Sequence, residues 1–348
     1  MKTIKVGLLG TGFLQDFVMQ AYREIPQAEV VAVGSYTEEN ATKFAETHKI
    51  PHVFSGETAI EDLCKLDVLD VVSIAIPNDL HLRAAVAAAE AGKHVICEKP
   101  LARTADEAHQ MLKAVEKAGV IHCYAENQVF FPLYNHVYDL IRKGKLGNVY
   151  MVRSREAHFG PHSPWFWDPK RSGGGVALDM GCHSVEVARK CFGNDTPEEV
   201  MMWADTLVHE TEAEDNCTIL VRYKNRQMGQ AENSWSAHGG LDLRTEIYGS
   251  EGVLFMDNTR ETGMKMFSNI EMDYVVEKAE SKKGWMFPLP NEYRVYGYYD
   301  EHAHFIESIV NEEPPIETFK DGVIVNAILD AGFKSVKEKK WTKVNLPF

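Results

Sequence analysis

The sequence predicts an α/β protein in which a doubly wound parallel sheet is followed by an α+β domain with an open, mostly antiparallel sheet. Three observations lead to this fold class: apolar runs alternate with helical patterns over residues 1–125, a Gly-x-Gly turn follows the first run, and long polar–apolar alternations fill the second half. The length of 348 residues favours two domains. We expect them at residues 1–125 and 126–348, with the C-terminal helices free to pack back on the first.

The first domain is expected to alternate strands with helices. The stretch Val68–Ile76 holds almost no polar residue, which is typical of a strand covered on both faces. Gly92 and Gly119 each follow a helical pattern, and glycine commonly ends helices. The alternation therefore predicts a parallel sheet. The expected strands are Ile4–Leu9, Glu29–Val33, Val68–Ile76, His94–Cys97 and Val120–Tyr124, and the expected helices are Phe13–Ile25, Glu38–His48, His81–Ala91 and Ala105–Ala118.

The pattern changes after about residue 130. Alternating runs of five to nine residues replace the fully apolar ones, as expected of an antiparallel sheet with one covered face. Residues 258–295 are irregular and rich in charged and aromatic side chains, so we expect a long excursion or lid there. The expected strands are Val149–Glu156, Asn216–Tyr223, Gln227–Trp235, Leu241–Tyr248 and Gly252–Met256, and the expected helices are Leu133–Lys143, Gly181–Cys191, 297–311 and 319–336.

Charge and cysteine content exclude several classes of protein. A net charge of −14 disfavours nucleic acid and anionic membranes as partners, because both attract basic surfaces. The six cysteines form no Cys-x-x-Cys pair, so a reduced, cytoplasmic protein is expected. The apolar run Val6–Leu14 resembles a short secretory signal, but its glycines and the following Asp16 favour a buried strand and turn. No apolar stretch approaches the ~20 residues of a membrane span.

The turn Gly10-Thr11-Gly12-Phe13-Leu14-Gln15 has the context of a dinucleotide-binding turn, because it follows a strand and precedes a helix. Gly10 permits the tight turn, and Gly12 lets the backbone approach a pyrophosphate at the helix N-terminus. Phe13 and Leu14 begin that helix beside the cofactor. Gln15 replaces the usual third glycine or alanine, so the motif is incomplete.

The end of the second strand bears on the choice between NAD and NADP. An acidic residue there binds the ribose hydroxyls of NAD, whereas a basic residue accepts the phosphate of NADP. This chain has Ser35 and Tyr36, which carry neither charge. Ser35 can bond either group, Tyr36 can lie against the adenine, and a plain turn is the alternative. The absence of an arginine favours NAD weakly, with NADP left open.

Two further segments supply titratable groups. Lys99 of Glu98-Lys99-Pro100 lies where a crossover strand would end, beside a bound nicotinamide, where it could shuttle a proton. The segment Gly173–His183 adds Asp179 and His183, four residues apart and on one face if that stretch is helical. Histidine suits proton transfer because its pKa lies near neutrality. The alternatives are a surface lysine, a helix N-cap aspartate and a structural histidine.

These segments give the chain a resemblance to the Gfo/Idh/MocA family of oxidoreductases, over essentially its full length. The most specific match runs from Ile76-Pro77-Asn78-Asp79-Leu80-His81 through Ala91-Gly92-Lys93-His94-Val95-Ile96-Cys97-Glu98-Lys99-Pro100-Leu101-Ala102; Gly173–His183 and Gly144–Val149 also match. The resemblance implies an N-terminal Rossmann domain, an open antiparallel sheet that often supports homodimers or homotetramers, and NAD(P)-dependent chemistry on a sugar or polyol hydroxyl.

The resemblance also implies roles for matched residues. Lys99 would orient the substrate hydroxyl and relay its proton, Asp179 would position substrate and lysine, and His183 would be the general acid/base. The family has an arginine at the position of Val129 and often an aspartate at Glu186, so a substrate contact from that arginine is not expected here. The remaining residues that the resemblance places near the cofactor are Pro77, Asn78, His81, Glu98 and Asn127.

Charged and aromatic residues that lie in the sequence between Lys99 and Gly173 suggest a substrate site. Glu156 and His158 precede the cluster Trp165-Phe166-Trp167, and such rings pack well on a sugar ring while acids and histidines meet its hydroxyls. The alternative places the aromatic cluster in the core or in a dimer contact. Glu156 and His158 could instead hold a metal with Asp179 or His183, but the spacing matches no zinc pattern, so no metal is expected. Basic residues nearby either bind a substrate anion or pair at the surface: Arg153, Arg155, Lys170 and Arg171.

The sequence therefore predicts an NAD(P)-dependent dehydrogenase or reductase acting on CH–OH groups of a sugar, an inositol-like polyol or a glycoside. Lys99, Asp179 and His183 would form the proton-relay set. One alternative is a lyase that oxidises a ring carbon transiently, eliminates, and then returns the hydride to product. Another is a non-catalytic dinucleotide sensor. The fold by itself separates none of the three, because this architecture serves many substrates.

Overall fold

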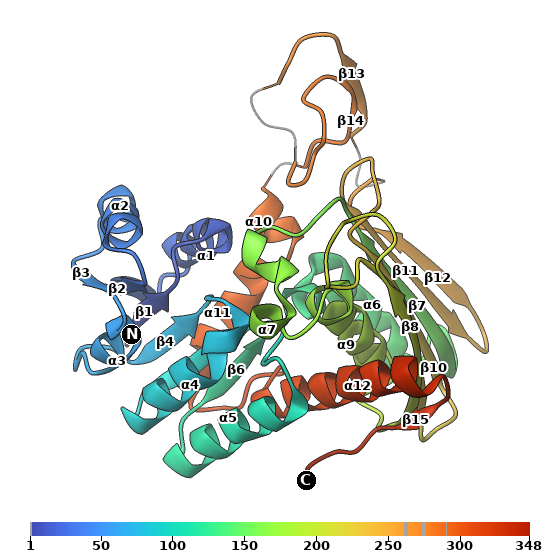
Figure 1. Cartoon of the computed structure of the whole chain (residues 1–348), viewed down its shortest axis with the longest axis horizontal. Helices are drawn as coiled ribbons and strands as arrows, with labels where there is room; N and C mark the ends of the chain where they lie inside the picture. Colours follow the sequence, from blue (N-terminus) through green and yellow to red (C-terminus); the bar gives the residue numbers. More distant parts are fainter. Residues whose placement is uncertain (1, 261–263, 273–275, 290) are drawn as a thin grey trace. The chain divides into compact units, whose positions relative to one another are not determined.

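The computed structural model describes residues 2–260, 264–272, 276–289 and 291–348 and divides into two compact units (Figure 1). The first unit comprises residues 1–130 and 297–326, and the second comprises residues 131–296 and 327–348. The first unit thus combines the N-terminal part of the chain with a segment near its C-terminus.

The first unit is built on a six-stranded parallel sheet with the order β3-β2-β1-β4-β5-β6. Its central strands are almost entirely buried, which explains their apolar sequences. The strand order reverses between β1 and β4, and ligands of such sheets bind beyond the carboxyl ends of the strands at this point. The strands are β1 (Ile4–Leu9), β2 (Ala28–Ser35), β3 (His52–Ser55), β4 (Val71–Ile74), β5 (His94–Glu98) and β6 (His122–Ala125).

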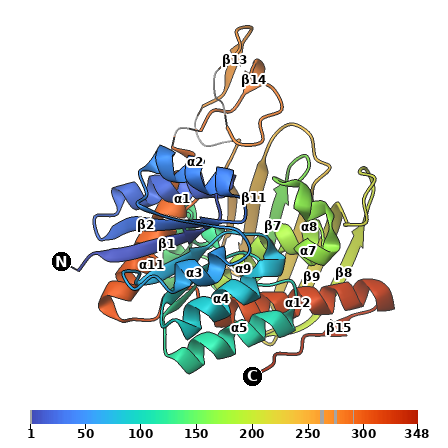
Figure 2. The ribbon, with the colours of Figure 1, turned by 60° about the vertical axis from the view of Figure 1, so that its left-hand side comes forward.

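Helices cover both faces of this sheet (Figure 2). Helices α1 and α2 lie on one side of the strands, and α3, α4 and α5 lie on the other. Helix α11 packs against α1, with the rings of Phe17 and Tyr298 5.6 Å apart. The helices are α1 (Phe13–Glu24), α2 (Glu38–His48), α3 (Ala59–Cys64), α4 (His81–Glu90), α5 (Ala105–Ala118) and α11 (Tyr298–Asn311), with 3₁₀ turns η1 (Asn78–Leu80) and η2 (Asn127–Phe130).

The second unit is built on a seven-stranded sheet with the order β12-β11-β7-β10-β9-β8-β15. Strands β7 and β10 are parallel, and the other neighbours are antiparallel. The predicted fold class, a doubly wound parallel sheet plus an open, mostly antiparallel one, is confirmed. The strands are β7 (Val149–Ala157), β8 (Pro197–Asp205), β9 (Asn216–Tyr223), β10 (Met228–Ser234), β11 (Asp242–Gly249), β12 (Val253–Asp257) and β15 (Thr342–Lys343).

One face of this second sheet is packed by α9 (Gly181–Cys191), whose residues contact β7, β9 and β10. The predicted excursion at 258–295 contains a small hairpin of β13 (Met266–Ser268) and β14 (Gly284–Met286), while residues 261–263, 273–275 and 290 lie outside the described part. No helix within the described residues has the length and apolar character needed to cross a membrane. The remaining elements are α6 (Pro132–Arg142), η3 (Pro164–Trp167), α7 (Pro169–Ser172), α8 (Val176–Asp179), α10 (Glu292–Val295) and α12 (Phe319–Glu338), the last shared by both units.

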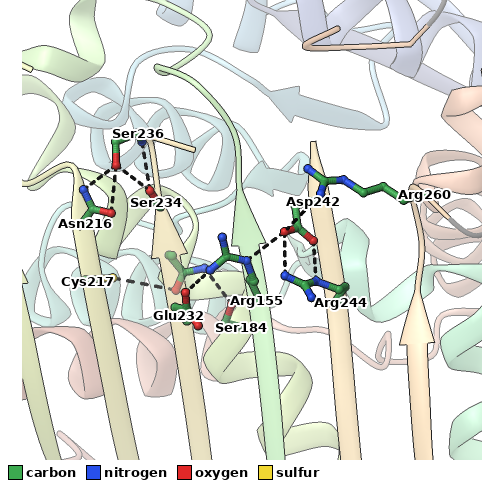
Figure 3. A network of polar contacts seen from close by, with 11 residues as sticks. Arg155, Ser184, Asn216, Cys217, Glu232, Ser234, Ser236, Asp242, Arg244 and Arg260 are labelled. Carbon is green, nitrogen blue, oxygen red and sulfur yellow. Dashed lines mark hydrogen bonds and ion pairs between the residues drawn. The ribbon is translucent and has the colours of Figure 1, made fainter. Parts of the chain in front are cut away.

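The other face of the second sheet carries a cross-strand network centred on Asp242 (Figure 3). Its carboxylate accepts hydrogen bonds from Arg155 Nε at 3.0 Å and from Arg244 Nε at 2.7 Å, and Arg155 also pairs with Glu232. Burial raises the pKa of Asp242, but the two arginines outweigh burial and hold it below its usual value. Arg155 therefore forms ion pairs between strands, which is the surface-pairing alternative given for the basic residues above. Arg153 likewise pairs with Glu246.

Candidate active site

The glycine turn of the first unit has the geometry of a phosphate-binding turn. Gly10 has a φ of +110°, and a Cβ there would lie 2.1 Å from Ala75 O, so only glycine fits. Gly12 is the N-cap of α1, so no side chain caps the first N–H groups of this helix. A Cβ built on Gly12 would meet no atom within 4 Å. The first N–H groups of α1 are therefore accessible to an anion, which fits the pyrophosphate of a dinucleotide. The half-exposed Phe13 and the partly buried Leu14 follow.

This chain departs from a standard dinucleotide-binding turn at Gln15 and at Ser35, and each side chain makes a local polar contact. Gln15 is buried, and its side-chain Nε2 donates to Leu9 O at 3.1 Å, so the amide supports the end of β1. Ser35 ends β2 and its hydroxyl lies 3.2 Å from Thr11 Oγ1, which links it to the turn. Tyr36 is 70% exposed, so its ring is available to stack on a base.

His81 braces the turn after β4 against the segment after β5. Its Nε2 lies 2.8 Å from Ile76 O, and its Nδ1 lies 3.1 Å from Pro100 O. Burial lowers the pKa of His81, against the opposing effect of these carbonyls. Both ring nitrogens of His81, which was predicted to lie near the cofactor, therefore face backbone carbonyl oxygens. Pro77 caps η1 and Asn78 is buried within it.

Lys99 stands directly after β5, with buried carboxyl groups beside it. Its backbone N–H donates to Glu98 Oε2 at 3.3 Å, and the Lys99–Pro100 peptide is cis. Burial raises the pKa of Glu98 and of Glu126 to about 8, and the charge of Lys99 opposes this rise in both. Glu126 follows β6 next to the buried Asn127. No sequence motif pointed to Glu126. Its neighbour Ala125 pairs with Glu98, so a predicted register of β5 and β6 would have placed Glu126 close to Glu98.

Two more buried acidic residues, Glu301 and Glu317, belong to the same group of carboxyls as Glu98 and Glu126. Glu301 of α11 and Glu317 are fully buried, and burial together with Glu98, Glu126 and Glu317 raises the pKa of Glu301 well above its usual value. His302 Nε2 lies 3.8 Å from Glu301 Oε2, and burial lowers the pKa of His302 to about 3. Burial therefore disfavours the charged form of both the carboxyl and the imidazole. No sequence motif pointed to these residues.

In the second unit, the three glycines before Asp179 are explained by backbone conformation and by close packing. Gly173 ends α7 with a φ of +91°, and a Cβ on Gly175 would lie 2.1 Å from Glu214 O. The Glu214 carboxylate accepts from Gly175 N at 2.7 Å and from Ala177 N at 3.2 Å, which fixes the start of α8. The motif therefore sets where α8 begins and where Asp179, its last residue, lies.

Asp179 and His183 lie on separate short helices, because the helical stretch is interrupted at Met180. Met180 occupies the N-cap position of α9, so the alternative of Asp179 as that cap is wrong. Trp235 Nε1 donates to Asp179 Oδ2 at 3.3 Å, and both Asp179 and His183 are buried. The structure thus offers one oriented carboxylate and one buried imidazole in this unit.

The predicted substrate residues gather around Trp235 in the same unit. Trp167 meets the Trp235 ring edge-on with centroids 5.1 Å apart, and Trp165 stacks on Phe166 at 3.8 Å. None of the η3 residues is buried, which excludes the core alternative for this cluster.

Glu156 and His158 lie at the end of β7 and are both buried. His158 N donates to Ser234 O at 3.0 Å, so the backbone here is tied to the end of β10. Within the described ranges, neither residue belongs to a group of three ligating side chains close enough to hold one ion.

A parallel sheet of this strand order, with an open glycine turn and a lysine at the same edge, defines a dinucleotide-binding enzyme of the oxidoreductase class. Sequence comparison agrees. Residues 4–126 match the profile described as an oxidoreductase family with an NAD-binding Rossmann fold, and residues 134–255 match the GFO/IDH/MocA C-terminal domain. The chain belongs to the GFO/IDH/MocA family, and it is an NAD-binding oxidoreductase of the sugar and polyol dehydrogenase type.

Named relatives and solved structures resemble most or nearly all of the chain. It is 27% identical to myo-inositol 2-dehydrogenase of Thermotoga maritima, with 98% of both chains covered. It is 30% identical to trans-1,2-dihydrobenzene-1,2-diol dehydrogenase of Xenopus laevis, over 72% of this chain and 74% of that one. The crystal structure of GenD2 from gentamicin A biosynthesis in complex with NAD superposes with a TM-score of 0.93 at 25% identity, covering 99% of this chain and 97% of that one.

Proposed function

We propose that the protein oxidises a hydroxyl-bearing carbon of a sugar, an inositol-like polyol or a glycoside, or reduces the matching ketone, with a nicotinamide cofactor. The observation that carries this proposal is the position of Lys99 immediately after β5. Because β1 and β5 run parallel in one sheet, Lys99 and the Gly10–Gly12 turn lie at the same edge. The relatives' names support the substrate class.

The two domains divide the work in this proposal. Residues 1–125 bind the dinucleotide, and residues 126–348 bind the substrate and form a homodimer or homotetramer through the second sheet. A reducing, cytoplasmic compartment is proposed as well, since all six cysteines are buried and free.

NAD is the proposed cofactor, in preference to NADP. Ser35 and Tyr36 offer no cation for a 2′-phosphate, and the similar GenD2 structure holds NAD. The bound cofactor supplies the hydride acceptor, or in reverse the donor. The residues proposed to hold it are Gly10, Gly12, Phe13, Leu14, Ser35, Tyr36, Pro77, Asn78, His81, Glu98, Lys99 and Asn127.

The proton follows a separate path from the hydride. Oxidation of an alcohol removes a hydride from carbon and a proton from oxygen. Lys99 is proposed to orient the substrate hydroxyl and relay its proton to His183, the general acid/base, while Asp179 positions the substrate and the lysine. Glu98 and Glu126, whose pKa burial raises to about 8, are mostly protonated at neutral pH.

The substrate contacts are proposed from the second unit. Trp165 supplies an aromatic face for the C–H side of a sugar ring, and Glu156 and His158 meet hydroxyls. Lys99, Asp179 and His183 complete the substrate-binding set at the reacting carbon.

The experiment is nicotinamide absorbance with both oxidised cofactors and a panel of sugars, inositols and glycosides. Steady NADH formation with one substrate is expected, at least tenfold faster than NADPH formation. Lys99→Ala and His183→Ala should lower kcat on the order of a hundredfold or more, whereas the exposed control Lys117→Ala should not.

Other outcomes separate the alternatives. Release of an aglycone without net NADH would identify a lyase that returns its hydride. Loss of activity on chelation would restore the metal alternative at Glu156 and His158. Near-normal rates in both variants would contradict the proton relay, and an inert protein that still binds NADH would indicate a sensor.

A further inference from the structure

The excursion of the second unit returns to the sheet through Lys278 and Glu277, at the loop that follows β7. Lys278 Nζ donates to Gly160 O at 2.6 Å, and Glu277 is hydrogen-bonded to His162. The backbone of Lys278 is left-handed, with a φ of +60°. Such a conformation is unfavourable for a residue with a side chain, so local contacts must maintain it.

A second attachment lies two residues further on, at the loop that follows β10. His238 Nδ1 lies 2.6 Å from Glu280 Oε1, and Gly239 N donates to Glu280 Oε2 at 3.1 Å. Strands β7 and β10 are parallel neighbours, so both loops leave the sheet at the same edge. The segment 277–280 is therefore fixed across this edge at two points.

Lys278 holds its charge close to Asp179 and His158. The side chain is partly buried, and burial lowers the pKa of Lys278, while Glu277 and Asp179 act in the opposite direction. An ammonium group has three hydrogens to donate. Of the described residues, Gly160 alone accepts one of them. Two hydrogens are left for a ligand or water.

His158 presents a second unused group beside this ammonium. Its Nδ1 is buried and has no hydrogen-bond partner among the described residues. Burial lowers the pKa of His158 well below its usual value, and His162 and Lys278 lower it further. The ring is therefore neutral, and a buried polar atom without a partner is costly enough to require a ligand or a water.

We propose that Lys278 is a substrate-binding residue, whose ammonium group, with Nδ1 of His158, binds two oxygens of the polyol that Asp179 orients. The inference deepens the proposed function and rests on it. The ligand class is an uncharged polyhydroxy compound rather than an anionic one, because Asp179 and Glu277 balance the charge of Lys278 and would repel a phosphate or carboxylate.

The test compares Lys278→Met and Lys278→Arg with Lys283→Met, an exposed lysine of the same excursion. Lys278→Met should raise KM for the polyol on the order of tenfold or more with kcat nearly unchanged, because it removes a charged hydrogen bond made in ground and transition states alike. The KM of Lys278→Arg should stay within a few-fold of the wild-type KM, and the KM of Lys283→Met should equal the wild-type KM. The Kd for NADH should not change in any variant.

A second readout does not depend on turnover. Substrate binding is followed by intrinsic tryptophan fluorescence, since Trp235 donates directly to Asp179. Weaker binding of the same sugars and inositols by Lys278→Met alone would support the inference. Equal affinity in Lys278→Met and wild type would overturn it, even in a protein that turns over normally, and tighter binding of a phosphorylated sugar than of its parent would overturn the ligand class. Failure of wild type to turn over any panel member would instead count against the proposed function.

Discussion

At the scale of single residues, the least predictable feature is the group of buried carboxyls around Lys99. The sequence identified Glu98 and Lys99 because they are adjacent and close a strand. It did not identify Glu126 or Glu301, which come from a different strand end and from a helix near the C-terminus. Acidic residues in a helix or a turn are usually exposed, so nothing local distinguishes these two. Only the folded first unit brings them near Glu98.

These carboxyls make stability depend on pH in a definite direction. The pKa of Glu126 rises from 4.5 to about 8 on folding, so the folded state binds a proton more tightly than the unfolded state. The stabilising effect is complete below about pH 4.5 and is lost as the pH rises through about 8. Glu126→Gln keeps the shape and loses the ionisation. Its Tm relative to wild type should therefore increase by several degrees between pH 5 and pH 8.5.

The measurement is thermal unfolding followed by circular dichroism at both pH values. Glu116→Gln, an exposed glutamate of α5, is the matched control and should show a constant Tm difference. A Tm difference for Glu126→Gln that is the same at pH 5 and pH 8.5 would show that the Glu126 carboxyl is ionised in the folded protein.

At the scale of elements, the sequence predicts best where burial is one-sided or complete over a long run. Helix α2 and strand β9 have the predicted bounds, because an amphipathic helix and an alternating strand each impose a clear period. Strand β3 and helix α3 were missed, being only four and six residues long. Strand β8 was missed as well, since it begins with Pro197-Glu198-Glu199 and this start hides its alternation.

The glycine turn offers a test that separates folding from binding. A Cβ on Gly10 would lie 2.1 Å from Ala75 O at a φ of +110°, so Gly10→Ala should destabilise the first unit by a few kcal/mol. A Cβ on Gly12 would meet no atom within 4 Å and the backbone φ is −79°, so Gly12→Ala should keep the wild-type Tm. If the pyrophosphate approaches Gly12, the added methyl should weaken NADH binding at least tenfold.

Calorimetry of unfolding and NADH fluorescence titration give the two readouts. The expected pattern is a lower Tm for Gly10→Ala and weaker NADH binding at normal Tm for Gly12→Ala. Wild-type affinity in Gly12→Ala would place the dinucleotide elsewhere than the N-terminus of α1.

At the scale of the whole molecule, the sequence predicted two kinds of sheet, but it could not predict which surfaces the second sheet leaves open. Alternation shows that a strand has two unlike faces, and tertiary packing decides which partner each face meets. Helix α9 packs on one face. On the other face, the strand register places Trp203 in the same cross-strand row as Glu232 and Arg155. Phe255 lies in the adjacent row, beside Glu246. Both aromatic residues are exposed.

An exposed face that mixes large aromatic residues with ordered ion pairs is typical of a protein–protein interface. We therefore expect a homodimer or homotetramer formed through this face, with Phe255 buried in it. In a two-fold interface each substitution counts twice, and burying a phenylalanine contributes roughly 1.5–3 kcal/mol per copy. Phe255→Glu should raise the dimer dissociation constant on the order of a hundredfold or more, since a buried glutamate adds its own cost.

Light scattering coupled to size-exclusion chromatography decides this prediction, because it reports mass independently of shape. The matched control is Phe267→Glu, since Phe267 is also exposed and lies on β13, outside the seven-stranded sheet. Wild type and Phe267→Glu should share one oligomeric mass, and Phe255→Glu should shift toward the 39.2 kDa monomer as the protein is diluted. A monomeric wild type, or a Phe255→Glu variant that keeps the wild-type mass on dilution, would mean that this face is not the interface. The exposed row would then need a different partner, because so large an aromatic surface beside ordered arginine–carboxylate pairs is not expected to remain in water without a function.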